Sequence, residues 1–257
     1  MDIIVLTKQV PDLVEELLVD ANGKELDRSY MKYILNESDD HALEQALILK
    51  EKYGGTVSVY SNNYGDVDET LFTALAKGVD EVYKIETNNA LINNHLLAKC
   101  YQNILSDTSY DLILTGVQSI EDIDGQIGAL LATYLHIPYV GVVNTIQVHS
   151  DFINVTKEFS GGVLSEMRIQ LPALIGIQAA EKPPRYVPIS KIRQAQKTGT
   201  IKEIKISLDD FPSDNDNVHI RKMYAPETGI GAEMLNGNND AIINRLVKIL
   251  SESGIVR

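Results

Sequence analysis

Short apolar runs alternate with helical patterns through the first half of the chain, and this alternation most limits the possible fold. Runs rich in apolar and β-branched residues at 3–7, 56–60, 81–85 and 111–115 predict buried strands. Helical spacing of apolar residues predicts helices over 39–53, 67–77, 91–105 and 125–135, three of which end near a glycine or a proline. Such alternation favours right-handed crossovers and a parallel sheet with helices on both faces. We therefore predict an α/β fold.

The pattern changes after residue 138. Residues 142–148, 152–159 and 163–170 predict antiparallel strands joined by turns, and 172–177 predicts one more strand. Asn22-Gly23, between 14–19 and 25–28, is a hairpin signal. Beyond Pro184 the periodicity is weak, the acidic stretch 209–217 predicts an exposed linker, and 240–251 predicts an amphipathic helix. We expect an α/β domain over 1–190 and a C-terminal arm over 191–257, whose helix either folds back or packs on another subunit.

Composition excludes several classes of function. The net charge of -13 argues against a nucleic-acid partner, because phosphate binding needs a basic surface. A single cysteine, Cys100, cannot form an internal disulfide, and its place in a helical pattern indicates a buried, inert thiol. The five histidines show no metal-ligand spacing, and no motif for a catalytic nucleophile is present. No apolar run reaches the roughly 20 residues of a membrane span, and no signal peptide is expected. A cytoplasmic location follows, or the mitochondrial matrix in a eukaryote, although no transit peptide is seen.

The loop after the strand at 111–115 carries the most informative segment, residues 114–130. Ligands of parallel sheets sit beyond the carboxyl ends of the strands. Here the strand ends at a glycine, acidic residues follow, and Gly125 and Gly128 open a helix whose backbone N–H groups could approach a phosphate. Asp122 and Asp124 can cap that helix. A plain helix cap with glycines in a turn explains the same residues equally well.

Three further polar loops flank the same predicted edge. Lys8 follows the first strand and would pair with a phosphate or carboxylate, unless it is a solvated surface lysine. Residues 36–39 precede the first long helix and have the form of a capping motif, and residues 61–65 read equally as a turn. Together the four loops indicate a Rossmann-like, adenine-nucleotide-binding domain that has no acid–base pair for chemistry on the nucleotide.

An ordered series of short motifs resembles that of the electron-transfer flavoprotein β subunits. The motifs are Lys8-Gln9-Val10-Pro11-Asp12, Asn36, Glu69-Thr70, Thr73-Ala74-Leu75-Ala76, Gly78, Asp80, Gly116-x-Gln118-x-Ile120, Asp122, Gln126, Gly128, Gly161-Gly162, Leu171-Pro172-Ala173 and Pro184-Arg185-Tyr186. Each motif is modest alone, but their order and spacing match over nearly the whole chain.

The resemblance implies a subunit of a heterodimeric electron carrier, which is not itself an enzyme with its own substrate. In that family an α subunit holds most of the redox FAD and receives the C-terminal arm of the β subunit. The β subunit binds AMP in simple carriers and a second FAD in electron-bifurcating ones. The implied partners are the α subunit, a flavin dehydrogenase and an acceptor such as a quinone oxidoreductase. The alternative is a nucleotide-binding regulatory module of the same fold without a redox partner. An adenylate enzyme or a dinucleotide-dependent dehydrogenase would need a glycine-rich loop after a strand, and residues 6–12 contain no glycine.

Carried over by position, the resemblance gives two sets of residues. The expected cofactor-binding residues are Leu6, Asn36, Glu37, Ser38, Asp39, Asn62, Ser119, Ile120, Glu121, Asp122, Ile123, Asp124, Gly125, Gln126, Ile127, Gly128, Ala129 and Leu130. The expected partner-docking residues are Ala180, Glu181 and Lys182. Glu181 stands where studied members carry an exposed leucine, so we expect a different partner specificity.

The residues expected to bind a phosphate, 124–128, distinguish the AMP-binding pattern from the FAD-binding pattern. Simple carriers usually read Asn-Gln-Thr-Gly where this chain has Gly125-Gln126-Ile127-Gly128, which is closer to the bifurcating pattern. Leu13 also replaces a tyrosine that simple carriers often place against the redox flavin. Asp124 opposes this inference, since a carboxylate near a phosphate repels it unless it points away, caps the helix or meets a cation. The sequence favours a second FAD slightly over AMP.

Overall fold

The computed structural model describes residues 1–88, 93–121, 124–211, 220–226, 229 and 231–255. Its first half contains β1 (Asp2–Thr7), β2 (Gln9–Pro11), β3 (Tyr33–Leu35), α1 (Glu37–Tyr53), β4 (Thr56–Asn62), α2 (Val67–Lys77), β5 (Glu81–Thr87), α3 (Asn94–Leu105), β6 (Leu112–Gly116) and α4 (Ile127–Leu135). Its second half contains β7 (Tyr139–Val148), β8 (Phe152–Phe159), β9 (Val163–Gln170), β10 (Ala173–Ile177), α5 (Ile189–Thr198), β11 (Ile201–Ile206), the 3-10 helix η1 (Leu208–Asp210) and α6 (Asn239–Glu252).

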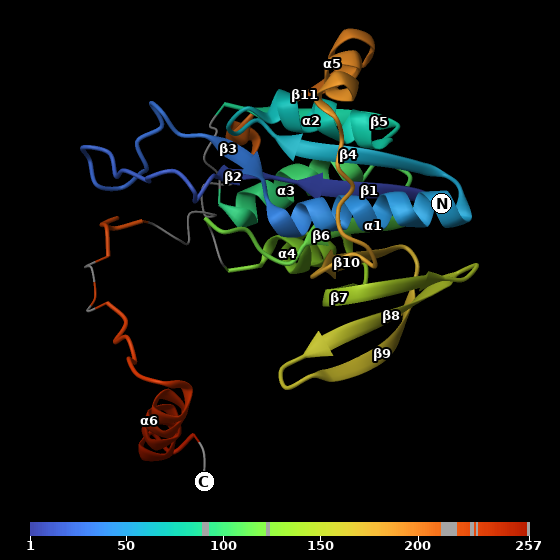
Figure 1. Cartoon of the computed structure of the whole chain (residues 1–257). Helices are drawn as coiled ribbons and strands as arrows, with labels where there is room; N and C mark the ends of the chain where they lie inside the picture. The colour runs from blue at the N-terminus through green and yellow to red at the C-terminus, as the bar shows by residue number, and fades with distance from the viewer. Residues whose placement is uncertain (89–92, 122–123, 212–219, 227–228, 230, 256–257) are drawn as a thin grey trace.

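One sheet of nine strands organises the molecule, in the order β11-β5-β4-β1-β6-β10-β7-β8-β9 (Figure 1). The strands from β11 to β7 are parallel, β8 is antiparallel to β7, and β9 is antiparallel to β8. The chain goes from β1 outward through β4 and β5 and then returns to place β6 on the other side of β1. The order therefore reverses between β1 and β6, which is where ligands bind in sheets of this kind. The predicted α/β class is confirmed.

The core lies on both faces of the parallel strands, which is why those strands are almost continuously apolar. Helices α1 and α2 cover one face through residues such as Leu43, Leu47 and Leu71. Helices α3 and α4 cover the other face, where Leu97 and Leu131 are buried. The glycine that follows α2 adopts the left-handed conformation, with φ 113° at Gly78, so the predicted end of this helix is confirmed.

The predicted strand at 172–177 exists, but its place in the sheet differs from the sequence order. It is β10, which lies between β6 and β7 and runs parallel to both. The three antiparallel strands predicted after residue 138 are confirmed as β7, β8 and β9. The hairpin expected around Asn22-Gly23 is reduced to a turn and one isolated bridge between Val19 and Leu26.

Two elements beyond Pro184 were missed by sequence patterning. Helix α5 lies beside α2, and none of its described residues is buried. Strand β11 pairs with β5 at the sheet edge, and its apolar Ile201, Ile204 and Ile206 alternate only in part. The boundary predicted at residue 190 thus falls in the first turn of α5, and both α5 and β11 pack with the main domain.

The C-terminal helix α6 is capped by Asn238, whose side chain accepts a hydrogen bond from Ala241 N at 2.9 Å. None of its described residues is buried, and Ile243 and Val247 are about half exposed. Figure 1 shows α6 away from the sheet. Of the two arrangements expected for this helix, folding back on the domain is not seen here. The linker predicted at 209–217 begins in η1, and residues 212–217 lie outside the described residues.

Candidate nucleotide site

One carboxylate joins the loops that follow β1 and β6. Asp39, in the first turn of α1, accepts hydrogen bonds from Lys8 N and from Gly116 N, each at 3.0 Å. The side chain is buried, and this burial raises the pKa of Asp39 to about 7 in spite of the hydrogen bonds that favour its ionised form. Asp39 therefore fixes the two backbones on either side of the reversal in strand order.

Asn36 and Ser38 hold the next part of the β6 loop. The Asn36 amide and the Ser38 hydroxyl both donate to the carbonyl of Gln118, at 2.9 and 2.8 Å. Asn36 stands at the N-cap of α1, but its side chain makes no cap hydrogen bond. The capping motif expected at 36–39 is thus used for contacts to a distant loop.

These contacts require a glycine at residue 116. A Cβ atom placed on Gly116 would lie 2.2 Å from Ser38 Oγ and 2.4 Å from Asp39 Oδ1. Such distances are far below van der Waals contact. The close approach of β6 to the start of α1 therefore depends on the absence of a side chain here.

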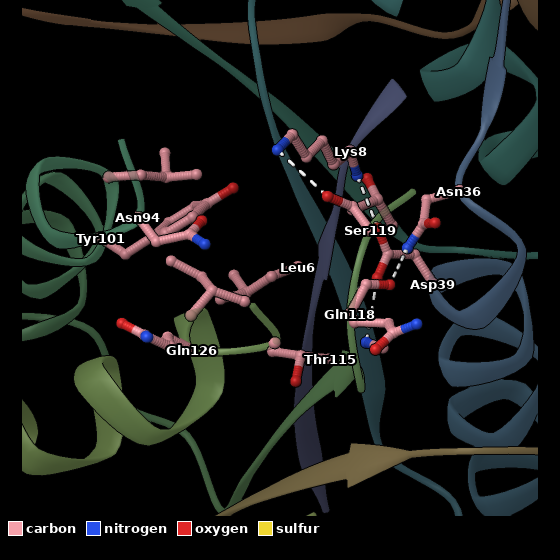
Figure 2. Close-up of a pocket in the computed structure, with 15 residues that line it drawn as sticks. Leu6, Lys8, Asn36, Asp39, Asn94, Tyr101, Thr115, Gln118, Ser119 and Gln126 are labelled. Carbon is pink, nitrogen blue, oxygen red and sulfur yellow. Dashed lines mark hydrogen bonds between the residues drawn. The ribbon is translucent and has the colours of Figure 1, made fainter. Parts of the chain in front are cut away.

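A pocket opens beside this junction, between the starts of α3 and α4 (Figure 2). It is lined by Leu6, Thr7, Lys8, Asn36, Asp39, Asn94, Leu97, Tyr101, Thr115, Gly116, Gln118, Ser119, Gly125, Gln126 and Ile127. Apolar side chains from β1, α3 and α4 meet polar groups from the loops, as in small-molecule sites. The enclosed space is about 30 Å³, room for about one water molecule.

Two contacts connect pocket residues to the loop between β6 and α4. Lys8 Nζ lies 2.6 Å from a carboxylate oxygen of Glu121 and 3.4 Å from Ser119 Oγ. The alternative of a solvated surface lysine is therefore wrong. Asn94 Nδ2, in the first turn of α3, donates to Asp124 Oδ1 at 2.6 Å. The carboxylate of Asp124 thus binds α3 and also accepts from Gln126 N at 3.3 Å.

Two polar features of the pocket lack partners within the described structure. The hydroxyl of Thr115 is buried and has no hydrogen-bond partner. Helix α4 begins at Ile127, and its N-cap residue Gln126 provides no side-chain cap. The first backbone N–H groups of a helix have no acceptor within the helix. Both features suit a ligand with hydrogen-bond acceptors.

Comparisons with known proteins give the family. The model of the electron transfer flavoprotein domain matches residues 25–209. A relative named electron transfer flavoprotein subunit beta, from Methylophilus methylotrophus, is 30% identical and the match covers 98% of each chain. The protein of the same name from Thermoanaerobacterium thermosaccharolyticum is 30% identical over 100% of both chains. A subunit of the caffeyl-CoA reductase-Etf complex of Acetobacterium woodii, CarD, is 28% identical over 100% of both.

The chain belongs to the electron transfer flavoprotein β-subunit family. It is therefore a component of a flavin-dependent electron carrier, and membership as a β subunit implies an α-subunit partner. None of the described helices combines the length and apolar content that crossing a membrane would need.

The β subunit brings some of the predicted site residues together and leaves others apart. Leu6, Asn36, Asp39, Ser119, Gly125, Gln126 and Ile127 line the pocket. Glu37, Ser38, Ile120 and Asp124 line a neighbouring open groove of about 950 Å³. Asn62 is buried at the end of β4, outside the residues that line the pocket, and its Oδ1 has no partner within the described structure. Glu121 pairs with Lys8, and Gly128, Ala129 and Leu130 lie within α4 outside the lining. Asp122 and Ile123 lie outside the described residues.

Gly125 in the loop and Gly128 in α4 are each required by the local backbone or packing. Gly125 has φ 61°, a left-handed conformation that favours glycine, and it precedes α4 instead of opening it. A Cβ atom on Gly128 would lie 2.8 Å from the ring of Tyr139, so this glycine lets α4 pack on β7. The predicted helix start at 125 is two residues early, and Asp124 therefore does not cap the helix.

Sequence reasoning missed the α3 wall of the pocket, and it gave Thr115 no ligand-binding role although Thr115 lies in the segment 114–130 that it singled out. Leu97 and Tyr101 are buried on α3, and their helical spacing indicated only a core face. Thr115 was taken as part of a buried strand. The one available signal was the rule that ligands lie beyond the carboxyl ends of strands, which applies to Thr115 directly.

The loop expected to dock partners lies along α1 of the same chain. Glu181 and Gln45 exchange two hydrogen bonds, at 3.0 and 3.1 Å, and Ala180 N donates to His41 Nδ1 at 3.2 Å. Lys182 is exposed. Close by, Arg185 forms an ion pair with Glu44 at 2.8 Å. Burial opposes ionisation of Glu44, but the hydrogen bonds from Arg185 outweigh it and lower the pKa of Glu44.

Proposed function

We propose that this β subunit binds an adenine nucleotide in the pocket between β1 and β6 and so supports electron transfer by the flavin of the heterodimer. One observation supports this most: at the reversal of strand order, Asp39 ties two loop backbones together beside a pocket with apolar walls. The expected external partners are a flavin dehydrogenase as donor and an acceptor such as a quinone oxidoreductase. Bound flavin supplies the redox chemistry, and the protein supplies binding, orientation and electrostatics.

The residues present fit an adenine nucleotide in their chemistry. Leu6, Leu97 and Tyr101 provide apolar surface for a base. The uncapped start of α4 provides N–H groups and a favourable dipole for a phosphate. Because the enclosed space is about 30 Å³, a base enters only if side chains around the pocket move. The contacts of Lys8 with Glu121 and of Asn94 with Asp124 are the candidates for this movement.

We infer that FAD is favoured over AMP. Ile127 and Gly125 resemble the bifurcating loop, and Asp124 is engaged with Asn94 and with Gln126 N. The open groove of about 950 Å³ shares Asn36, Gln118 and Gly125 with the pocket. A ligand longer than AMP could therefore extend from the pocket into the groove.

The test is the nucleotide content of the chain co-expressed with its α subunit. Acid release followed by chromatography and quantification should give two FAD per heterodimer. One FAD and one AMP would keep the nucleotide site but correct its ligand. One FAD with no further nucleotide, both in the purified pair and after incubation with AMP and with FAD, would refute the proposal.

A further inference from the structure

The hydroxyl of Thr115 differs from the hydroxyls of Thr7 and Ser61, which also lie at the carboxyl ends of central strands. Thr7 Oγ1 donates to the carbonyl of Tyr60 at 3.4 Å, and Ser61 Oγ donates to the carbonyl of Thr7 at 3.0 Å. Thr115 is equally buried, at 1% exposed, yet Oγ1 has no partner within the described part of the chain. A buried hydroxyl without a partner destabilises the fold, so its presence calls for an explanation.

The position of Thr115 suggests what completes its hydrogen bonding. Thr115 lines the pocket, and Oγ1 lies 3.2 Å from where a Cβ atom of Gly128 would stand. Gly128 is the second residue of α4, whose first turn has no side-chain cap. The hydroxyl therefore lies beside the first turn of α4, whose N–H groups also need an acceptor.

We propose that Thr115 contacts the bound nucleotide directly, with Oγ donating a hydrogen bond to a phosphate oxygen at the start of α4. This inference rests on the proposed function, and it adds a residue outside the set that the family resemblance gave. It assigns to α4 and the end of β6 one shared anion site, in which the helix supplies backbone donors and Thr115 supplies a side-chain donor.

The test is Thr115→Val, which keeps the shape of the side chain and replaces the hydroxyl by a methyl group. The free protein should be as stable as wild type or more stable, because an unpaired buried hydroxyl is removed. Binding of AMP and of FAD should weaken by about 10-fold or more, the effect of losing one hydrogen bond to a charged group. The two effects thus have opposite signs, which a purely structural role does not give.

Two further variants serve as controls. The nucleotide affinity and the stability of wild type and every variant are measured on the co-purified pair after its nucleotides have been removed. Thr115→Ser keeps a hydroxyl and should retain most of the affinity. Thr145→Val removes a hydrogen bond between two threonines at 2.7 Å on β7 and β8, away from the pocket, and should lower stability without changing affinity.

The outcomes separate this inference from the proposed function. Wild-type affinity in Thr115→Val overturns the role of Thr115 and leaves the nucleotide site standing. Equal loss of affinity in Thr115→Val and Thr145→Val also overturns it, because stability alone would then explain the loss. A wild-type pair that binds neither AMP nor FAD overturns both proposals.

Discussion

The buried carboxylate of Asp39 should make the stability of the chain depend on pH. Its pKa is about 7 in the folded state, above the ordinary value of 3.8, because burial disfavours the charge. Between these two pH values the folded chain holds a proton that the unfolded chain has released. This contribution to stability is fully present below pH 3.8 and is lost as pH rises through 7. From about pH 5 to about pH 8, Asp39 should lower the free energy of unfolding by about 3 kcal/mol.

The substitution that isolates this effect is Asp39→Asn, since an amide does not titrate in this range. Urea unfolding of the full chain, followed by circular dichroism at about pH 5 and about pH 8, gives the change in unfolding free energy for each protein. The loss found in wild type should be smaller in Asp39→Asn by about 3 kcal/mol. Glu37→Gln is the matched control, because Glu37 is an exposed carboxylate in the same helical turn. Equal pH dependence in wild type and Asp39→Asn would refute the reasoning.

The same substitution should weaken nucleotide binding, for a different reason. The ionised carboxylate accepts one backbone N–H on each oxygen, from Lys8 and from Gly116. An amide has one acceptor oxygen, so one of the two loops is released, at a cost of about 1.5–3 kcal/mol. The affinity of Asp39→Asn should therefore be lower than that of wild type at about pH 8. The difference should shrink at about pH 5, where the wild-type carboxyl is itself protonated.

Three other changes test separate parts of the structure. Truncation after Ser207 should leave the α/β domain folded, because the last strand of the sheet ends at Ile206. The truncated chain should no longer co-purify with the α subunit. A truncated chain that still pairs would show that α6 is not needed for binding the α subunit. Arg185→Ala should lower the unfolding free energy by about 2 kcal/mol, because Glu44 loses its charged hydrogen-bond donor. Arg193→Ala, at an exposed residue of α5, should change the unfolding free energy little. Equal effects of the two substitutions in urea unfolding would contradict this expectation. Gly116→Ala should empty the nucleotide site, since the new methyl group displaces Ser38 and Asp39; full nucleotide content after acid release would show that the loop adapts.

The fold could be predicted well where local signals agree. Helix α2 occupies the predicted residues 67–77 because its apolar spacing and the glycine that follows point to the same end. Strand β11 was missed because an edge strand buries little, so its sequence carries little periodicity. The insertion of β10 between β6 and β7 was also beyond the sequence, because local patterns specify strands and not their neighbours.

The candidate site shows the same division between local and distant effects. The sequence indicated that these loops meet at one edge of the sheet, because the loops after strands could be located from the alternation. It did not indicate what Asn36 and Asp39 do, because both are also common capping residues and their partners lie 82 and 77 residues away. A capping motif is thus ambiguous by nature: the same short polar side chains satisfy a backbone group of their own helix or of another loop.

That ambiguity has a consequence for how this pocket binds a ligand. The side chains of Asn36 and Ser38 donate hydrogen bonds to Gln118 O. The carboxylate of Asp39 accepts hydrogen bonds from Lys8 N and Gly116 N. They hold the loops in place and have correspondingly less capacity for a nucleotide. In the proposed site, recognition of the nucleotide would therefore depend on the apolar walls, on the backbone at the start of α4 and on the hydroxyl of Thr115. Backbone donors suit a phosphate on any nucleotide, so in the proposed site discrimination between AMP and FAD would arise where the pocket meets the groove, at Asn36, Gln118 and Gly125.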